Sequence, residues 1–218
     1  MNVTRTQLAG AIAAVGLVVP AAALAATIEG GPGGERLRGT QFADTIDGNG
    51  GNDRIRGLRG ADALDGGPGN DRIGGGAGND SSFGANGRDR RAGGPGDDAQ
   101  DGGAGNDTIF ANRGVDVSAG GAGNDVLWAL ARADVKPGAN GEIDIVGDAL
   151  DGGDGDDLLR TRDGEVERLT CGPGRDRAVL DAVDVITDAT PANRNGSCEV
   201  VVRRAPERRS PRSWQLAR

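Results

Sequence analysis

A nine-residue period runs through the first half of this chain and restricts the folds open to it. Read in steps of nine from Gly30, the sequence gives eleven consecutive blocks that end at Trp128, among them GNGGNDRIR, GGPGNDRIG and GGAGNDTIF. A further block, GGDGDDLLR, spans residues 152–160, and a degenerate one, CGPGRDRAV, begins at Cys171. A period held over this length indicates a repeat architecture and not a disordered Gly-rich segment.

The composition argues against one large packed core. Hydrophobic residues make up 36% of the 218 residues and aromatic residues 2%, while 41 residues are Gly. Each block offers one aliphatic side chain at its eighth position, which is too little apolar surface to fold a block alone. We therefore expect two blocks to form one coil and successive coils to stack, so that block n lies beside block n+2. The predicted fold is all-β, a parallel β-roll (β-solenoid) of nonapeptide repeats.

Each block divides into a turn and a strand. Glycines at positions one, two and four permit positive φ and close backbone packing, and the Asn and Asp residues at position five are expected in the left-handed region. Positions seven to nine form a short strand whose middle side chain points inward. The inward aliphatic residues are Leu37, Ile46, Ile55, Leu64, Ile73, Ile109, Leu127 and Leu159.

Aspartate recurs at position six of the blocks. Stacking places the aspartates of alternate blocks about 4.8 Å apart, the spacing of neighbouring strands. Carboxylates this close repel one another unless a cation lies between them. Oxygen ligands without His or Cys favour Ca²⁺, and turn carbonyls can complete the coordination. One edge is predicted to carry Asp53, Asp71, Asp89, Asp107 and Asp125, and the other edge Asp44, Asp62, Asp80, Asp98 and Asp116.

The pattern glycine-glycine-x-glycine-x-aspartate-x-apolar-x resembles the RTX-type (haemolysin-type) calcium-binding nonapeptide repeat family. The resemblance implies a secreted bacterial protein that binds calcium ions between stacked turns, through aspartates and turn carbonyls. The metal-ligand role is carried over where the aspartate and the glycines both match, at Asp53, Asp62, Asp71, Asp80, Asp89, Asp98, Asp107, Asp125 and Asp157. Many relatives are toxins or hydrolases with a large catalytic or pore-forming region. This sequence has no such region, so toxin or lytic activity is not carried over.

Several blocks depart from the pattern. The inward position is polar in four of them, at Ser82, Arg91, Gln100 and Ser118. An unpaired inward arginine would cost several kcal/mol, so the strand of Arg91 is expected to be displaced, or its side chain to escape at the edge of the roll. The block that begins at Ala111 lacks its first two glycines and carries the β-branched Val115 at position five, which predicts a local irregularity.

The ends of the sequence differ from the repeat. An uncharged run over residues 8–25 ends in Ala-Leu-Ala, a small-x-small cleavage pattern, which favours a secretory signal peptide over a membrane anchor. The predicted division is a signal peptide at 1–25, a calcium-binding β-roll at 26–160 with an irregular excursion at about 129–151, a β-rich C-terminal cap at 161–202, and a basic, disordered tail at 203–218.

Two cysteines, Cys171 and Cys198, are the only ones in the sequence. An exported protein matures where thiols oxidise, so we expect them to form one disulfide that clamps the cap. Two free thiols or a metal pair are the alternatives, and the absence of His argues against a zinc site.

The charge and the missing residue types exclude several functions. The net charge of −8 describes a surface that repels nucleic acid and anionic lipid and attracts cations. Without His, catalytic triads and most metal-hydrolase sites are excluded, and the chain is predicted not to be an enzyme. Two functions stay open: a secreted calcium-binding protein that folds on binding Ca²⁺, or a cell-surface or matrix adhesin or scaffold in which calcium is only a structural ion. No membrane insertion is expected after signal removal.

Overall fold

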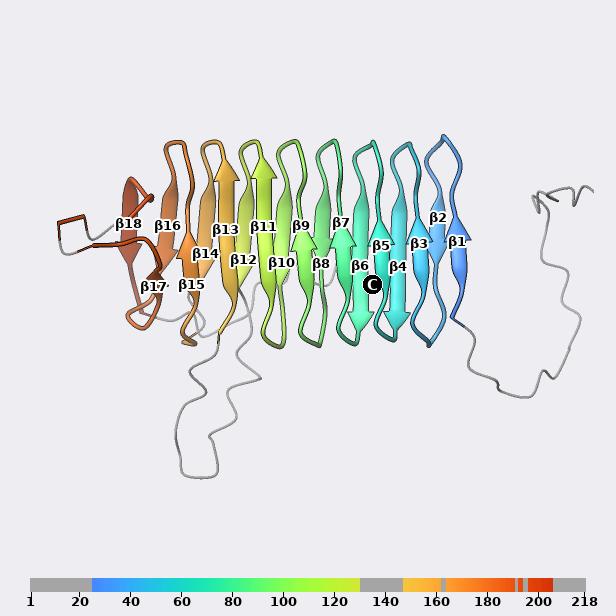
Figure 1. Ribbon diagram of the computed structural model, residues 1–218, viewed down its shortest axis with the longest axis horizontal. Coiled ribbons are helices and arrows are strands. Elements are labelled where there is room, and N and C mark those ends of the chain that lie inside the picture. Colours follow the sequence, from blue (N-terminus) through green and yellow to red (C-terminus); the bar gives the residue numbers. More distant parts are fainter. Residues whose placement is uncertain (1–24, 130–146, 162–163, 191, 194–195, 206–218) are drawn as a thin grey trace, which may run out of the picture.

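The computed structural model describes residues 25–129, 147–161, 164–190, 192–193 and 196–205, which form one elongated roll (Figure 1). Eighteen strands make two nine-stranded parallel sheets, and the described residues contain no helix. The all-β parallel β-roll predicted from the repeat is confirmed. The predicted signal peptide up to Leu24 lies outside the described residues, as do most of the predicted excursion and the tail after Ala205.

The two sheets take alternate strands. The odd sheet contains β1 (Thr27–Glu29), β3 (Thr45–Asp47), β5 (Ala63–Asp65), β7 (Ser81–Phe83), β9 (Ala99–Asp101), β11 (Val117–Ala122), β13 (Ala149–Asp154), β15 (Arg168–Thr170) and β17 (Val185–Ile186). The even sheet contains β2 (Arg36–Arg38), β4 (Arg54–Arg59), β6 (Arg72–Ala77), β8 (Arg90–Ala92), β10 (Thr108–Ala111), β12 (Val126–Ala129), β14 (Leu158–Thr161), β16 (Arg177–Leu180) and β18 (Val200–Arg203).

Equivalent block positions stack on one another. Ile55 pairs with Ile73 between β4 and β6, and Ile109 pairs with Leu127 between β10 and β12. Each block therefore lies beside the block two further along, as the repeat predicts. The predicted inward side chains form a thin core between the sheets, because their neighbours at positions seven and nine point to the outer faces.

The apolar core is divided in two. One cluster contains Ile46, Ile55, Leu64 and Ile73, with Ile28 and Leu37 packed against it. The other contains Ile109, Leu127, Ala129, Leu150, Leu159, Leu169, Cys171, Ala178, Leu180, Ile186 and Cys198. The polar inward residues Ser82, Arg91 and Gln100 lie between the two clusters and are buried. The central coils consequently gain less from apolar burial than the coils on either side of them.

The expectation for Arg91 was wrong. Strand β8 is not displaced, since it pairs in register with β6 and β10, and the Arg91 side chain is only 1% exposed. Parallel pairing on both sides fixes the inward direction of the side chain. Its Nη1 donates to the backbone carbonyl of Asp101 and lies 2.9 Å from the point where a Cβ on Gly84 would stand. The missing side chain of Gly84 thus leaves room for the guanidinium.

The left-handed turn residues are at positions two and four, not at position five as predicted. Gly76 and Gly78, at positions two and four of one block, have φ of 124° and 132°. Asn49, Leu58 and Ala85 replace glycine at position two and also have positive φ. Position-five residues are absent from the described residues with positive φ.

The irregularity predicted for the block of Ala111 is absent from the strand pairing. Strand β11 pairs in register with β9 on one side and β13 on the other, and Gly114 keeps a positive φ of 119°. Val115 meets no conformational obstacle, because position five does not need the left-handed region.

The roll does not end at Arg160, where the sequence placed the boundary of the cap. Strands β15 and β17 extend the odd sheet, and β16 and β18 extend the even sheet. The β-rich segment expected at 161–202 is present, and it continues the stacking with inward Leu169, Ala178 and Ile186. The predicted disulfide between Cys171 and Cys198 is confirmed, with a Cα–Cα distance of 5.2 Å.

Candidate metal-binding edges

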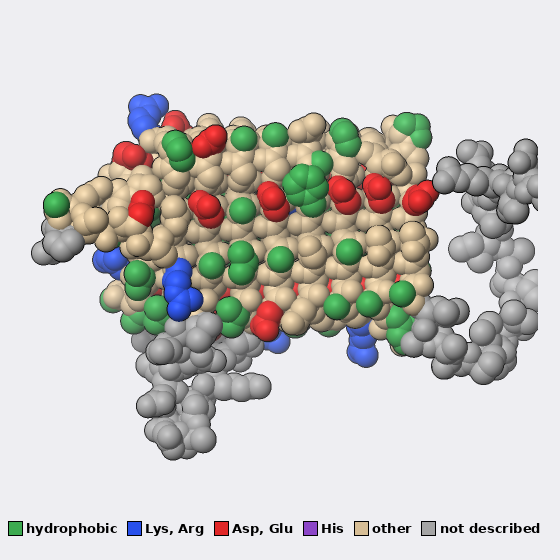
Figure 2. All heavy atoms as spheres, viewed as in Figure 1, with side chains coloured by type: hydrophobic (Ala, Val, Ile, Leu, Met, Phe, Trp, Pro, Cys, Tyr) green, Lys and Arg blue, Asp and Glu red, His purple; other side chains and the backbone are tan. Residues whose placement is uncertain are grey.

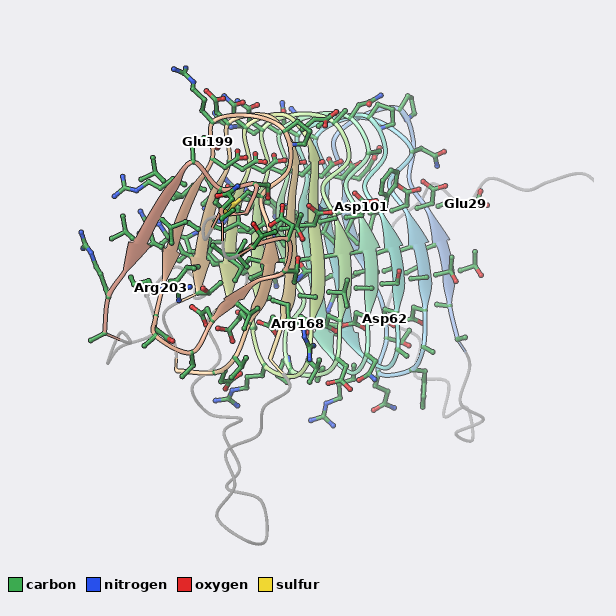
Figure 3. All side chains as sticks on the ribbon, turned by 60° about the vertical axis from the view of Figure 1, so that its left-hand side comes forward. Glu29, Asp62, Asp101, Arg168, Glu199 and Arg203 are labelled. Carbon is green, nitrogen blue, oxygen red and sulfur yellow. A yellow bond between two sulfur atoms is a disulfide. The ribbon has the colours of Figure 1, made fainter. Side chains whose placement is uncertain are left out.

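Two columns of buried aspartates run along the edges of the roll, one residue per coil. The even-sheet column, which precedes the even strands, contains Asp53, Asp71, Asp89, Asp107, Asp125, Asp157 and Asp176. The odd-sheet column contains Asp44, Asp62, Asp80, Asp98, Asp116 and Asp148. None of these side chains is more than 4% exposed. Asp62 and Glu199, whose side chain extends the even-sheet column, lie at opposite edges in Figure 3.

One oxygen of each carboxylate is used by the backbone of the preceding coil. The N–H of Asp53 donates to Oδ1 of Asp71 at 2.7 Å, and the N–H of Asp62 donates to Oδ1 of Asp80 at 2.8 Å. The same bond recurs along both columns and crosses from Asp125 to Asp157, 32 residues away. This ladder requires a short side chain with an acceptor, so position six has a structural role that does not depend on a metal.

The other carboxylate oxygen, Oδ2, takes no part in this ladder. Oδ2 is buried without a hydrogen-bond partner in Asp53, Asp62, Asp71, Asp80, Asp89, Asp98, Asp107, Asp125, Asp157 and Asp176. In all of these except Asp176, whose block begins with Cys171, Oδ2 points toward the glycine at position one of its own turn: Oδ2 of Asp53 lies 2.7 Å from the place of a Cβ on Gly48. A buried anionic oxygen without a partner is costly. A row of such oxygens fits a cation.

Burial raises the pKa of many of these carboxyl groups. The pKa of Asp98 rises to about 8, that of Asp89 to about 7 and that of Asp71 to about 6. Desolvation is the largest cause, and the repulsion of neighbouring aspartates adds to it, whereas the backbone N–H bonds act in the opposite direction. Without a cation, the columns would take up protons near neutral pH.

Asp44 is an exception within the odd-sheet column. Its block has Thr40 in place of the second glycine, and the N–H of Thr40 donates to Oδ2 of Asp44 at 2.5 Å. The hydroxyl of Thr40 also donates to this carboxylate. Although burial opposes the change, these bonds and the N–H of Ala26 lower the pKa of Asp44. The chain itself satisfies Asp44, which is not among the predicted ligands.

Backbone carbonyls must supply the remaining ligands of any metal. Among the described residues, no three His, Cys, Asp or Glu side chains lie close enough together to hold a metal ion. The stacked turns bring carbonyl oxygens close to the next coil: a Cβ on Gly34 would lie 2.8 Å from the carbonyl oxygen of Asn52, and one on Gly51 would lie 2.7 Å from that of Gly33. The turns are therefore rich in hard oxygen donors, which suit Ca²⁺.

A second ladder, missed by the sequence analysis, uses the side chains at position five. The N–H of Asn70 donates to Oδ1 of Asn52 at 2.7 Å, and the N–H of Arg88 donates to Oδ1 of Asn70 at 2.7 Å. The bonds run in the opposite sense to those of the aspartate columns. The recurrence of Asn and Asp at position five is the sequence signal of this ladder, and it reflects a stacking contact and not a preference for the left-handed region.

All nine predicted ligands lie in the two columns, six in the even-sheet column and three, Asp62, Asp80 and Asp98, in the odd-sheet column. They are brought together in single file, with alternate aspartates adjacent. Asp148 and Asp176 extend the columns and were not among the predicted ligands. Asp176 stands at position six of the degenerate block that begins at Cys171, whereas no block was assigned around Asp148.

A comparison with known protein families identifies the repeat. Residues 29–64, 56–90 and 92–127 match the family model described as RTX calcium-binding nonapeptide repeat (4 copies). A search of curated proteins finds no match to the chain. In the part of the chain that the structure describes, no helix is long and apolar enough to cross a membrane.

Proposed function

Since residues 29–127 carry RTX calcium-binding nonapeptide repeats, we propose that this chain is a secreted calcium-binding protein whose roll folds as Ca²⁺ binds along its edges. The observation that carries the proposal is the row of buried Oδ2 atoms without partners. A divalent cation beside these oxygens would replace the missing partners and offset the repulsion within each column.

The two carboxylate oxygens have separate tasks in this proposal. Oδ1 holds the preceding coil in register through its backbone N–H bond, as Asp125 does for Asp107. Oδ2 faces the position-one glycine and is available to a cation together with turn carbonyls. The proposed ligands are the nine predicted aspartates, whose turns all have glycine at position one.

Folding is coupled to binding because the calcium-free roll has little else to stabilise it. The core is one side chain wide and is interrupted by Arg91 and Gln100. Conformational entropy opposes ordering of more than a hundred residues, and the buried carboxylates repel one another. A cation bound only by the folded state shifts this balance toward the roll.

The proposal includes export and no enzymatic activity. Residues 1–25 would act as a cleaved signal peptide, so that the mature chain begins near Ala26 and meets calcium outside the cell. N-terminal sequencing of protein from the culture medium checks this point, and retention of Met1 would contradict it.

A calcium titration followed by far-UV circular dichroism tests the proposal. Metal-free protein should be largely disordered and should gain strand signal cooperatively, with a midpoint of about 10⁻⁴ to 10⁻³ M, the range of extracellular modules. Mg²⁺ is the control and should not fold the roll, because it requires a smaller and more regular octahedral site. A protein fully folded in excess chelator would contradict the coupling.

The alternative is an extracellular adhesin or scaffold in which calcium is only a structural ion. This alternative predicts the same calcium titration, so the titration does not distinguish the two proposed functions. Only the scaffold requires a cell-surface or matrix partner that binds the calcium-loaded roll. A pull-down from cell-envelope material with calcium-loaded protein, and chelated protein as the control, distinguishes them.

A further inference from the structure

The outer face of the even sheet carries rows of arginine at its N-terminal end. Arg36, Arg54, Arg72 and Arg90 occupy position seven of successive even strands and pair in register. Arg38 and Arg56 form a shorter row at position nine. These positions alternate with inward Leu37 and Ile55, so the arginines lie on the outer face.

The outer face of the odd sheet carries acidic residues over the same coils. Glu29, Asp47 and Asp65 pair in register at position nine of β1, β3 and β5, and Asp101 follows after Phe83. Figure 2 shows this face, with a row of acidic side chains along the roll that a large hydrophobic side chain interrupts. Glu29 and Asp101 lie at the same height on this face in Figure 3.

The arginine rows are electrostatically unfavourable by themselves. Burial and the charges of Arg54, Arg38 and Arg36 lower the pKa of Arg56. Cations in register on adjacent strands repel one another. Negative charge placed over this face would relieve that repulsion, and the rows repeat with the spacing of the coils.

The acidic row of a second copy matches the arginine row in spacing and position. Both rows repeat once per coil, because the same stack of strands sets both periods. The odd and even strands run in opposite directions (Figure 1). Translating a copy perpendicular to the sheets therefore brings position nine of its odd sheet over position seven of the even sheet.

We propose that two copies of this chain dock face to face, the odd sheet of one on the even sheet of the other. Coil by coil, Glu29 meets Arg36 of the second copy, Asp47 meets Arg54, and Asp65 meets Arg72. Small side chains at position seven of the odd sheet, Thr27 and Thr45, then face the long Arg38 and Arg56, so the backbones can approach.

The exposed aromatic residue in the acidic row fits the same arrangement. Phe83 is 41% exposed and falls in the coil of Arg90. Arg90 already places its guanidinium 5.1 Å from the ring centroid of Phe110. A ring of a second copy over a guanidinium is a favourable cation–π contact, so the break in the acidic row adds a contact and does not leave a gap.

The contact is heterologous, so each copy keeps one acidic and one basic face free for further copies. Such an interface does not close and produces linear stacks. Single exposed ion pairs contribute little, about 0–1 kcal/mol each, so association depends on the whole row and weakens as salt screens it. The rows exist only in the folded roll. The inference thus rests on the proposed function where calcium is needed for folding.

The second copy is favoured over a polyanion because its acidic row repeats once per coil, as the arginine row does. The acidic face of another copy is held in matched spacing and brings its own basic face to the next copy.

Sedimentation equilibrium of the mature protein in excess calcium tests the docking. At low salt the weight-average mass should rise with concentration to at least twice the monomer mass. It should return to the monomer mass in about 1 M salt, where the Debye length is about 3 Å. Circular dichroism on the same samples confirms that the roll is folded. If the roll also folds in chelator, sedimentation equilibrium is repeated in chelator. A failure of the docking is then distinguished from a failure of the coupling between calcium binding and folding.

Charge exchange identifies the faces. The variant Arg36→Glu with Arg72→Glu and the variant Glu29→Arg with Asp65→Arg should each lose association, whereas an equal mixture of the two should recover it. Arg59→Glu with Arg113→Glu is the matched control, because both arginines are exposed outside the rows. This control makes the same change in net charge as Arg36→Glu with Arg72→Glu. It should associate like the unaltered chain.

Three results would overturn the proposal. The first is a folded protein that stays monomeric at every concentration. The second is association that survives in each charge-exchange variant alone. The third is a monomeric protein that binds dextran sulfate through Arg36 and Arg72, which would assign the arginine rows to a polyanion.

Discussion

The backbone N–H of Asp89 donates to Oδ1 of Asp107 at 2.8 Å, one coil further along the roll. Oδ2 of the same Asp107 is buried without a hydrogen-bond partner. One side chain thus joins two coils with one oxygen and presents the other to the turn. The two roles can be separated by substitution.

Asp107→Asn should abolish the contribution of this site to calcium binding while keeping the bond to Asp89, because an amide oxygen is still an acceptor. Asp107→Ala should lose both, with a further destabilisation of about 1 kcal/mol from the missing bond. Calcium titrations of both variants, with urea unfolding in saturating calcium, measure the two effects. Equal unfolding free energies for the Asn and Ala variants would contradict the structural role of Oδ1.

Asn106→Ala is the matched control for these variants. Oδ1 of Asn106 accepts the N–H of Asn124 at 3.0 Å in the position-five ladder, but this side chain is neutral. Its loss should cost about 1 kcal/mol in urea and leave the number of bound calcium ions unchanged. Fewer bound ions in Asn106→Ala would assign a ligand role to the outer ladder.

Asp107→Ala should raise the calcium midpoint more than Asp116→Ala. The turn of Asp116 has Ala111 and Asn112 at positions one and two, where most turns have glycine. A Cβ at position one stands where Oδ2 lies in the other turns, for example 2.7 Å from Oδ2 of Asp107 at Gly102. Equal calcium midpoints for the two variants, measured by circular dichroism, would contradict the link between the glycines and binding.

Acid should stabilise the calcium-free roll. Burial raises the folded-state pKa of Asp98 to about 8 and of Asp157 to about 7, above the usual value of 3.8. Between about pH 4 and pH 8 the folded state therefore binds more protons than the unfolded chain, and its stability falls as pH rises through this window. Strand content of metal-free protein should be greater near pH 5 than near pH 8.

The calcium dependence should change in the opposite direction with pH. Protons compete with the cation for the same carboxylates, so the calcium midpoint should increase as pH falls from about 8 to about 5. Metal must be removed by a chelating resin for this comparison, because soluble chelators also titrate. Strand content that is independent of pH in the absence of metal would contradict the burial of these carboxylates.

Arg91→Met should stabilise the roll. Burial lowers the pKa of Arg91, and the nearby charges of Asp107 and Asp89 oppose this only in part. Replacing a buried charged group by an apolar side chain of similar volume is often neutral or stabilising by about 1–4 kcal/mol, and Met would join the two apolar clusters. The calcium midpoint should decrease. Arg88→Met, at an exposed turn position, is the control. A higher midpoint for Arg91→Met would mean that Arg91 serves as a counter-charge that the aspartates need.

Removal of the disulfide should weaken the C-terminal coils. Cys171 and Cys198 are separated by 27 positions, and closing a loop of this size stabilises by about 3 kcal/mol in the chain-entropy model. The variant Cys171→Ser with Cys198→Ser should unfold at lower urea in saturating calcium, and the loss of protection should be greatest over β15–β18 in hydrogen exchange. Uniform loss of protection along the roll would contradict a local role.

The sequence predicts those features of the roll that depend on contacts within one nine-residue block. The spacing of glycine, Asp107 and Ile109 within nine residues was enough to predict the turn, the strand and the inward face, because these depend on backbone conformation and side-chain alternation. The stacking of alternate blocks followed from the small apolar surface of one block. The nine candidate ligands and their two edges were therefore available from the sequence.

Only the tertiary structure decided features that depend on the neighbouring coil. Asn70 at position five contacts the coil beside it, and Arg91 is accommodated by the space at Gly84. The segment after Thr161 joins the sheets with only one degenerate block, because strand pairing requires backbone hydrogen bonds and an inward apolar residue such as Leu169. The sequence by itself determined the repeating unit, and the stacking of coils decided which departures from that unit the roll can accept.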